Sequence, residues 1–268
     1  MLRNPLFVFV TIGLAFFGTT APRAAVLNLD YGKNPEWKYT MEYHSECRFT
    51  ENDTTSTKKT ELSCVLDGSL AEKADAVALR VKDLTVNSEL YDDNTKAAMA
   101  KKLTETNFTL PLEDGAPSIA GLGDLSSDGL PEWNLYVQFA KLLPQLPQQA
   151  TKKGFSWERS GRLKVRTKQG DVPCEVYRRF KVDRFSADND TAFISWRFKY
   201  SAAKAVRDTS TLLKYVPVAG KGKGAAVIHV GDGYIVSASM EFMTPVAKVG
   251  KAKVNWKEIA SLKREVDK

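Results

Sequence analysis

WKYTMEYH, residues 37–44, is the stretch that best indicates the fold class of this chain. Aromatic or apolar residues occupy its odd positions and polar residues its even ones, which is the period of a strand with one buried face. The same alternation recurs around residues 62–66, 77–81, 108–112, 163–182, 192–200, 226–242 and 252–256. We therefore predict a mainly β (α+β) fold, in which a curved antiparallel sheet or half-barrel carries one or two helices on its concave face.

Turn and bulge signals separate the predicted strands. The polar run at residues 51–58 is typical of a hairpin turn, which we expect to be centred at positions 55 and 56. Asp232-Gly233 is a strong two-residue hairpin signal. The apolar phase changes between Val81 and Leu84, which predicts a bulge near residues 82–83.

Two segments have helical character. Asp92 or Asp93 can cap a short helix over residues 95–104. After a Gly-, Pro-, Ser- and Asp-rich loop at residues 113–131, apolar residues recur at helical spacing up to Leu143, and the prolines that follow end the helix. Trp133 and Tyr136 lie on this second helix and are our candidates for contacting a bound ligand.

The first 25 residues have the order of a secretory signal peptide. Arg3 precedes an apolar run of about 13 residues, and mostly small residues follow at 19–25. Because a membrane-spanning helix needs roughly 20 apolar residues, we predict cleavage near Ala24 or Ala25. The alternative is an uncleaved anchor. The predicted organisation is a signal peptide at 1–25 and a single β-rich domain at 26–268, soluble in a periplasm or outside the cell.

Composition limits the chemistry of the chain. The 268 residues carry a formal net charge of +7, which falls to +5 once Arg3 and Arg23 leave with the signal. A hydrophobic fraction of 43% with 26% charged residues is typical of a globular protein. With only two histidines, one copy cannot build a three-histidine metal site. We expect no catalytic residue, no metal and no cofactor.

The cysteines suggest an oxidising compartment. With the hairpin centred at 55 and 56, Cys47 and Cys64 stand opposite each other on the apolar faces of their strands, where Cβ atoms are about 4.5–5.5 Å apart. Together with export, this predicts a Cys47–Cys64 disulfide, and the alternative is two buried thiols. Cys174, on the apolar face of a later strand, is expected to be a buried and inert thiol.

One predicted strand carries a basic stripe on its polar face. Arg197 and Lys199 on a later strand can extend it. Such a stripe can contact membrane phosphates or an acidic envelope polymer, and the alternative is a plain solvated face. Since the aromatic residues fall on the opposite face, we expect no nucleic-acid partner. The stripe consists of Arg162, Lys164, Arg166 and Lys168.

The glycine- and lysine-rich segment at 220–224 invites comparison with a phosphate-binding loop. It lacks the G-x-x-x-x-G-K-[ST] spacing, and Ala225 stands where a hydroxyl is needed. We therefore expect a flexible basic loop between strands. Lys221 and Lys223 are further candidates for contact with an anionic headgroup or glycan.

Neither histidine is spaced with other ligands or acids in a way typical of a metal or catalytic site. His44 falls on the polar face of its strand, and His229 is expected to face the sheet interior beside Val236 and Ala238. We interpret both as structural. The adjacent acids Asp92 and Asp93 are better explained as helix caps than as an acid–base pair.

LPQLP at 143–147, followed by GFSW at 154–157, resembles uncharacterised secreted bacterial envelope proteins in which a Pro-rich stretch precedes Gly and Trp at the start of a strand. A long antiparallel sheet after a signal peptide, interrupted by helical segments, also resembles the half-barrels of periplasmic lipoprotein-carrier and mycobacterial lipid-transfer proteins. The resemblance implies a concave apolar face that holds acyl chains or another apolar ligand and is closed by helices. It assigns no individual binding residue.

Three functions remain open at this point. The first is an exported, non-enzymatic envelope protein that binds an apolar or lipid-like ligand. The second is a structural or interaction protein of the envelope, with a filled core and the basic face as its contact surface. The third is a secreted hydrolase, which would have to use His44 or His229. A contiguous apolar cavity would favour the first function, and a filled interior the second.

Overall fold

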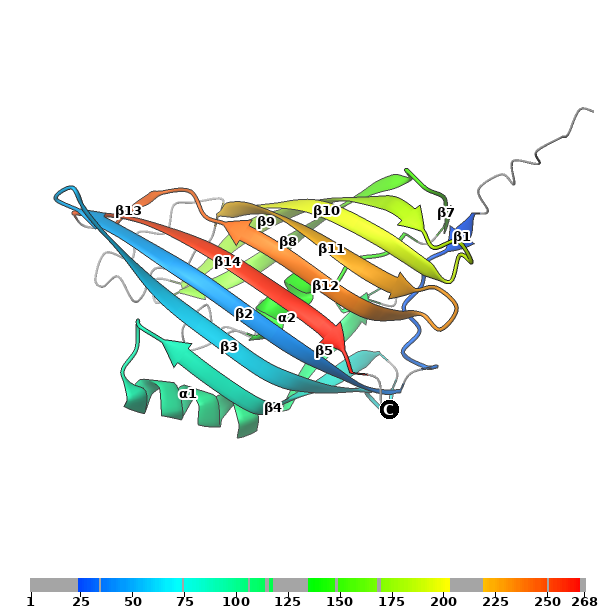
Figure 1. Ribbon diagram of the computed structural model, residues 1–268, viewed down its shortest axis with the longest axis horizontal. Coiled ribbons are helices and arrows are strands. Elements are labelled where there is room, and N and C mark those ends of the chain that lie inside the picture. Colours follow the sequence, from blue (N-terminus) through cyan, green and yellow to red (C-terminus); the bar gives the residue numbers. More distant parts are fainter. Residues whose placement is uncertain are drawn as a thin grey trace, which may run out of the picture.

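The computed structural model describes residues 24–33, 35–73, 75–105, 107–113, 116–117, 135–147, 149–167, 170–202, 219–249 and 251–265. Most of these residues belong to one 12-stranded antiparallel sheet, shown in Figure 1. Along its main path the strand order is β6-β5-β4-β3-β2-β14-β12-β11-β10-β9-β8, and β13 pairs with β14. The predicted mainly β fold with a curved antiparallel sheet is confirmed.

The first part of the chain forms a run of neighbouring strands. They are β2 (Glu36–Glu51), β3 (Thr54–Leu70), β4 (Ala76–Ser88), β5 (Asn107–Glu113) and β6 (Ala116–Pro117). The predicted bulge lies in β4, where Asp83 has a positive φ of 49° and the register with β3 shifts between Ser63 and Val65. The bulge lets Leu84 and Val86 return to the same face of the sheet as Val81.

The second part forms another run of neighbours. It comprises β8 (Ser156–Thr167), β9 (Gly170–Phe185), β10 (Thr191–Ala202), β11 (Gly220–His229) and β12 (Tyr234–Met243). The hairpin predicted at Asp232-Gly233 joins β11 to β12. It has four loop residues rather than two, since His229 pairs with Tyr234. Gly233 has a φ of 66°, and its Cβ would come within 2.7 Å of the Asp30 nitrogen, which explains why glycine stands there.

The last long strand joins the two runs. β14 (Ala252–Arg264) lies between β2 and β12 and pairs with both. The three-residue β13 (Ala247–Val249) pairs with its start. Figure 1 shows β14 in red beside the blue β2, near the middle of the sheet. Separately, β1 (Ala25–Val26) pairs with β7 (Ala150–Thr151).

Two helices accompany the sheet. Helix α1 (Asp93–Glu105) packs against β4 and buries Leu103. The Asp92 carboxylate accepts a hydrogen bond from the Thr95 backbone nitrogen at 2.8 Å, which confirms the predicted cap. Helix α2 (Leu135–Leu142) packs against β12 and β14 and ends before Pro144, as predicted. None of the helices in the described ranges has the length and apolar character needed to cross a membrane.

We call the face of the sheet that carries Trp37, Tyr39 and Met41 the inner face, and the opposite one the outer face. Phe139 of α2 stacks on Trp37 with ring centroids 5.9 Å apart, so α2 lies on the inner face. Apolar residues of nearly every long strand are buried here and form one main cluster with Phe139 and Leu142. The core therefore lies between the inner face and the segments packed on it.

The predicted Cys47–Cys64 disulfide is wrong. The β2–β3 turn is Asn52-Asp53, with φ values of 47° and 62°, rather than positions 55 and 56. Asn and Asp tolerate these positive φ values, whereas the following polar residues continue as an exposed strand. Cys47 therefore stands opposite Lys58, and Cys64 stands opposite Met41. The two cysteines are about 20 Å apart along the strands, and the structure joins neither to the other.

The flexible loop predicted at 220–224 is also wrong, because these residues belong to β11. Gly220, Gly222 and Gly224 face the inner side, where a Cβ would come within 2.3 Å of the rings of Phe242, Phe198 and Trp196, respectively. The glycines are required for close approach of aromatic rings to the sheet rather than for flexibility.

Candidate functional site

The inner face is the candidate functional site, and aromatic rings line much of it. Phe180 lies between Trp157 and Trp196, with ring centroids 5.1 Å and 6.0 Å away. Phe198 stacks on Phe242 at 5.8 Å. The first three rings come from the adjacent strands β8, β9 and β10, and Phe198 and Phe242 meet over Gly222 of the intervening β11, so the rings form a continuous apolar surface across the sheet.

A row of polar residues interrupts this apolar surface. The backbone register places Arg178, Phe198, Gly222, Phe242, Glu258, Ser45, Thr60 and Ser88 side by side across eight strands. All the polar members of this row are buried: Arg178, Glu258, Ser45, Thr60 and Ser88. We call these five residues the polar row. Burying so many polar groups on one level of a sheet is costly unless each finds a partner.

On β2 and β14, the polar row separates two apolar regions that lie along the strands. Tyr43 and Ala260 lie on one side of it and belong to the main cluster with α2. Cys47 and Trp256 lie on the other side and belong to a second cluster, with Ala252 and Val254. The inner face is therefore apolar, then polar, then apolar again along these two strands.

Helix α2 docks on the polar row through a buried ion pair. The Lys141 Nζ lies 3.0 Å from the Glu258 Oε2, and both side chains are buried. The Gln138 Nε2 donates a hydrogen bond to the same carboxylate oxygen at 3.4 Å, and the Gln138 Oε1 accepts one from the Lys141 Nζ at 3.4 Å. The Lys141 ammonium also lies 4.7 Å from the centroid of the Phe242 ring, a favourable position for a cation. The Lys141–Glu258 ion pair therefore fixes the position of α2 along the strands.

Side chains of β8 and β9 hold the segment that follows α2. The Trp157 indole nitrogen donates to the Gln145 carbonyl oxygen at 2.7 Å, and Arg159 donates to the Leu146 carbonyl oxygen at 3.3 Å. Arg178 donates to the Leu143 carbonyl oxygen at 3.1 Å. These bonds satisfy backbone carbonyl groups of the irregular segment that follows α2, so Pro-rich residues 143–147 are part of the inner layer.

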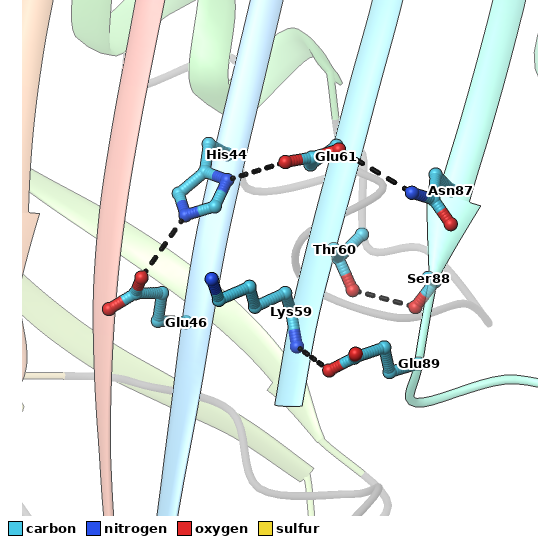
Figure 2. Close-up of polar contacts among 8 residues, drawn as sticks. All are labelled: His44, Glu46, Lys59, Thr60, Glu61, Asn87, Ser88 and Glu89. Atoms are coloured by element: carbon cyan, nitrogen blue, oxygen red, sulfur yellow. Dashed lines mark hydrogen bonds and ion pairs between the residues drawn. The ribbon is translucent and has the colours of Figure 1, made fainter. Parts of the chain in front are cut away.

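Where the structure describes it, the contact between α2 and the sheet is closely packed. Beside Trp37, Phe139 and Leu143 it leaves a cavity of about 10 Å³, room for about one water molecule at most. Further along the polar row, contacts are less complete. Thr60 and Ser88 hydrogen-bond to each other at 2.7 Å (Figure 2). The buried Ser45 Oγ and Trp256 Nε1 have no hydrogen-bond partner among the residues that the structure describes.

The outer face carries a basic groove across β9 to β14. The groove has a volume of about 990 Å³ and a floor of small residues, among them Ser195 and Ala225. Lys223 stands directly opposite Arg197, and Lys221 directly opposite Lys199. Basic side chains therefore gather on three adjacent levels of the outer face, where they are exposed: Arg179, Lys181, Arg197, Lys199, Lys221 and Lys223. We call these six residues the basic patch.

Acidic residues compensate the basic patch only in part. Glu241 lies 3.1 Å from Lys223 and 3.6 Å from Lys257. The Lys223 hydrogen bond and charge, helped by Lys257, hold the pKa of Glu241 below its usual value. Three large apolar side chains are exposed on the same face: Tyr177, Met243 and Ile259.

The predicted site residues divide into two groups. Lys221 and Lys223 lie exposed on the outer face, in line with the predicted contact with an anion. The other candidates lie outside the described part: Trp133 and Lys168 entirely, and Tyr136, Arg162, Lys164, Arg166 and Cys174 in their side chains.

The histidines lie on the outer side of the sheet. His44 contacts Glu61 at 3.4 Å and Glu46 at 3.5 Å, and Figure 2 shows it between the two carboxylates. The prediction that His229 faces the interior is wrong. It is half-buried, stacks on Tyr234 with ring centroids 5.0 Å apart and lies 3.3 Å from the Asp232 carboxylate. Regular alternation along β11 places Ala226 and Ile228 on the inner face and therefore turns His229 outward. In the described ranges, no group of three His, Cys, Asp or Glu could hold a metal ion.

Reasoning from the sequence missed the polar row. Ser45 and Glu258 each occupy a position at which the alternating pattern of their strand places an apolar residue. A charged residue in phase with Trp256 and Ala260 was the available signal. The register that brings Ser45 beside Glu258, by contrast, depends on pairing between residues more than 200 positions apart.

No protein family and no curated protein matches the chain. Among solved structures, it is similar to one titled "Lipid-protein interactions in lipovitellin", at 10% identity with a TM-score of 0.43, over 87% of this chain and 25% of that chain. The chain thus spans about a quarter of the length of that protein. It is also similar to the Salmonella type III secretion secretin InvG, at 12% identity with a TM-score of 0.17, over 87% of this chain and 66% of that chain. At TM-scores below 0.5, neither likeness establishes a shared fold.

Proposed function

We propose that the protein is an exported, non-enzymatic binder of an apolar or lipid-like ligand, which lies on the inner face of the sheet. The observation that carries this proposal is the continuous aromatic surface of the inner face from β8 to β12, where Phe180 lies between Trp157 and Trp196 and Phe198 stacks on Phe242. Clustered aromatic side chains on a sheet face are typical of sites for apolar ligands.

The second apolar cluster supports the proposal further. Cys47, Val254 and Trp256 lie beyond the polar row, on the side away from the α2 core. All three side chains are buried, so a ligand on this cluster would replace the part of the chain that now covers it; apolar sites of this kind are typical of ligand pockets. The tight contact between α2 and the sheet favours the filled-interior alternative locally, so the ligand is assigned to the inner face beyond that contact.

Tryptophan fluorescence provides the test, since Trp37, Trp157, Trp196 and Trp256 all face the inner side. Fatty acid methyl esters brominated along the chain are titrated into the protein purified without its first 25 residues. We expect saturable quenching, reduced in Trp256→Phe, and a bound lipid in native mass spectrometry of the exported protein. Absence of both quenching and bound lipid would refute ligand binding and favour the alternative of a structural or interaction protein of the envelope.

A second candidate function, contact with an anionic membrane surface, rests on the basic patch. Each Lys or Arg near an anionic bilayer contributes about 1 kcal/mol, and the exposed Tyr177 and Met243 lie at the level of Lys199 and Lys221 on the outer face. Replacing Lys221 and Lys223 together with Ala is expected to weaken binding to phosphatidylglycerol vesicles roughly tenfold or more. Phosphatidylcholine vesicles give the baseline.

The matched control for this experiment replaces Lys73 and Lys101 with Ala. Lys73 lies in the turn before β4 and Lys101 on α1, both exposed and away from the patch, and their loss removes the same charge. Equal binding by the two double variants would attribute vesicle binding to net charge alone and exclude the basic patch as a specific surface.

A further inference from the structure

The basic groove on the outer face has room for a ligand. Its volume is about 990 Å³, and it crosses the strands from β9 to β14. The floor is made of small side chains, because the backbone register places Ser195, Ala225 and Ser239 side by side on β10, β11 and β12. Ala225 and Ser239 are exposed and Ser195 is half-buried, so the groove offers two serine hydroxyls to a ligand that lies on its floor.

A row of cations lies beside this floor, one level along the strands. Arg197 of β10 stands directly opposite Arg179 of β9 on one side and Lys223 of β11 on the other. Because adjacent strands are about 4.8 Å apart, the backbones of these three residues lie within about 10 Å. Lys181 adds a further cation on β9, and Arg179 lies 3.8 Å from Glu158. Like charges gathered at this spacing repel each other, and a ligand with several negative charges would relieve the repulsion.

Acidic residues of the groove neutralise only part of this charge. Within the part of the chain that the structure describes, five basic and two acidic side chains line the groove, and the acidic ones are Asp183 and Glu241. Glu241 lies 3.1 Å from Lys223, at the end of the cation row. The planar guanidinium of Arg197, in the middle of the row, can bind a carboxylate through two parallel hydrogen bonds.

The shape of the groove favours a narrow chain over a flat surface. A bilayer would contact the exposed basic side chains around the groove, such as Lys199 and Lys221, which do not line it. The floor at Ser195 and Ser239 is accessible to a polymer chain that lies within the groove. Sugar hydroxyls donate and accept hydrogen bonds, as serine hydroxyls do, and sugars that carry carboxylates also supply the negative charge.

We propose that the basic groove binds a linear acidic polysaccharide. Its sugar carboxylates pair with Arg197 and the neighbouring cations, and its hydroxyls bond to Ser195 and Ser239. This inference goes beyond the proposed binding of an apolar ligand on the inner face and does not depend on it. It also differs from the second candidate function, in which a bilayer contacts the whole basic patch.

The test uses hexagalacturonate and its fully methyl-esterified form, which has the same sugars without the charges. Each is titrated by calorimetry, at physiological salt, into the protein purified without its first 25 residues. The variants are Arg197→Gln in the groove and, as a matched control, Lys199→Gln, which removes the same charge from the same strand outside the groove. We expect Arg197→Gln to weaken binding of hexagalacturonate roughly 5- to 10-fold and Lys199→Gln to weaken it less than about twofold. The methyl ester is expected not to bind.

The other outcomes contradict the proposal in different ways. Equal weakening by the two variants would attribute binding to the charge of the basic patch as a whole and overturn the assignment to the groove. Failure of hexagalacturonate to bind, or equal binding of its methyl ester, would exclude an acidic polysaccharide. Phosphatidylglycerol vesicles bound by the same protein in that case would assign the basic patch to a bilayer. Both replaced side chains are exposed, so both variants should melt with the parent protein, and quenching by brominated esters on the inner face is measured separately.

Discussion

Replacing Lys141 with Met should destabilise the protein strongly, because it leaves a buried carboxylate without its partner. The Glu258 side chain is only 3% exposed and forms an ion pair with Lys141 at 3.0 Å. Removing one member of a buried pair costs about 3–5 kcal/mol. In a domain of this size, about 1 kcal/mol lowers Tm by roughly 2–4 °C, so Lys141→Met is expected to melt about 6–20 °C below the parent protein.

The double variant Lys141→Met with Glu258→Leu separates the charge effect from lost packing. Replacing both members of a buried pair with apolar residues is often neutral or stabilising, so the double variant should melt well above the single one. Lys101→Met serves as the control, since its exposed pair with Glu105 on α1 should contribute about 0.5 kcal/mol or less. The reasoning fails if Lys141→Met melts within about 2 °C of the parent, or if the double variant melts no higher than Lys141→Met.

Three further predictions concern the inner face, the cysteines and the outer face. Gly222→Ala should lose about 1–3 kcal/mol in urea unfolding, since its Cβ would come within 2.3 Å of the Phe198 ring and 2.4 Å of the Glu241 carbonyl oxygen; Gly161→Ala, with open space around its Cβ, should be nearly neutral. Burial raises the pKa of Cys64 to about 12, so at pH 8 iodoacetamide should label it only after unfolding, and peptide mapping under non-reducing conditions should find no Cys47–Cys64 link; finding that linked peptide would contradict the β2–β3 register. Lys223→Ala should raise the pKa of Glu241 toward its usual value, because it removes the largest stabilisation of that carboxylate; an NMR titration that shows no change would refute the ion pair.

Local patterns predicted most of the fold. Period-2 alternation located the long strands, because a sheet with one buried face imposes that period wherever packing requires it. Asp92 was identified as a cap because capping depends on only the few residues that follow it. The bulge at Asp83 was visible as a change of phase within a single strand.

Features that depend on register or on distant partners could not be predicted in the same way. A turn placed three residues too late at 55 and 56 produced an incorrect disulfide, because each residue of turn displacement moves the cross-strand partner by two. The glycines of β11 resemble a flexible loop in sequence, and only the rings of Phe198 and Trp196 facing them explain their presence. The polar row requires pairing across eight strands, which no single segment encodes.

The position of β14 has a consequence for the order of folding. This strand pairs with β2, whose residues are made about 200 positions earlier, and with β12. At about 5–20 residues per second, ribosomal synthesis of the intervening chain takes roughly 10–40 s. During that interval, the edge of β2 that β14 will occupy lacks this partner, so the sheet cannot be completed until β14 has been made. Such a delay in the central pairing would suit the export predicted from residues 1–25, because a chain is threaded across a membrane before its fold is complete.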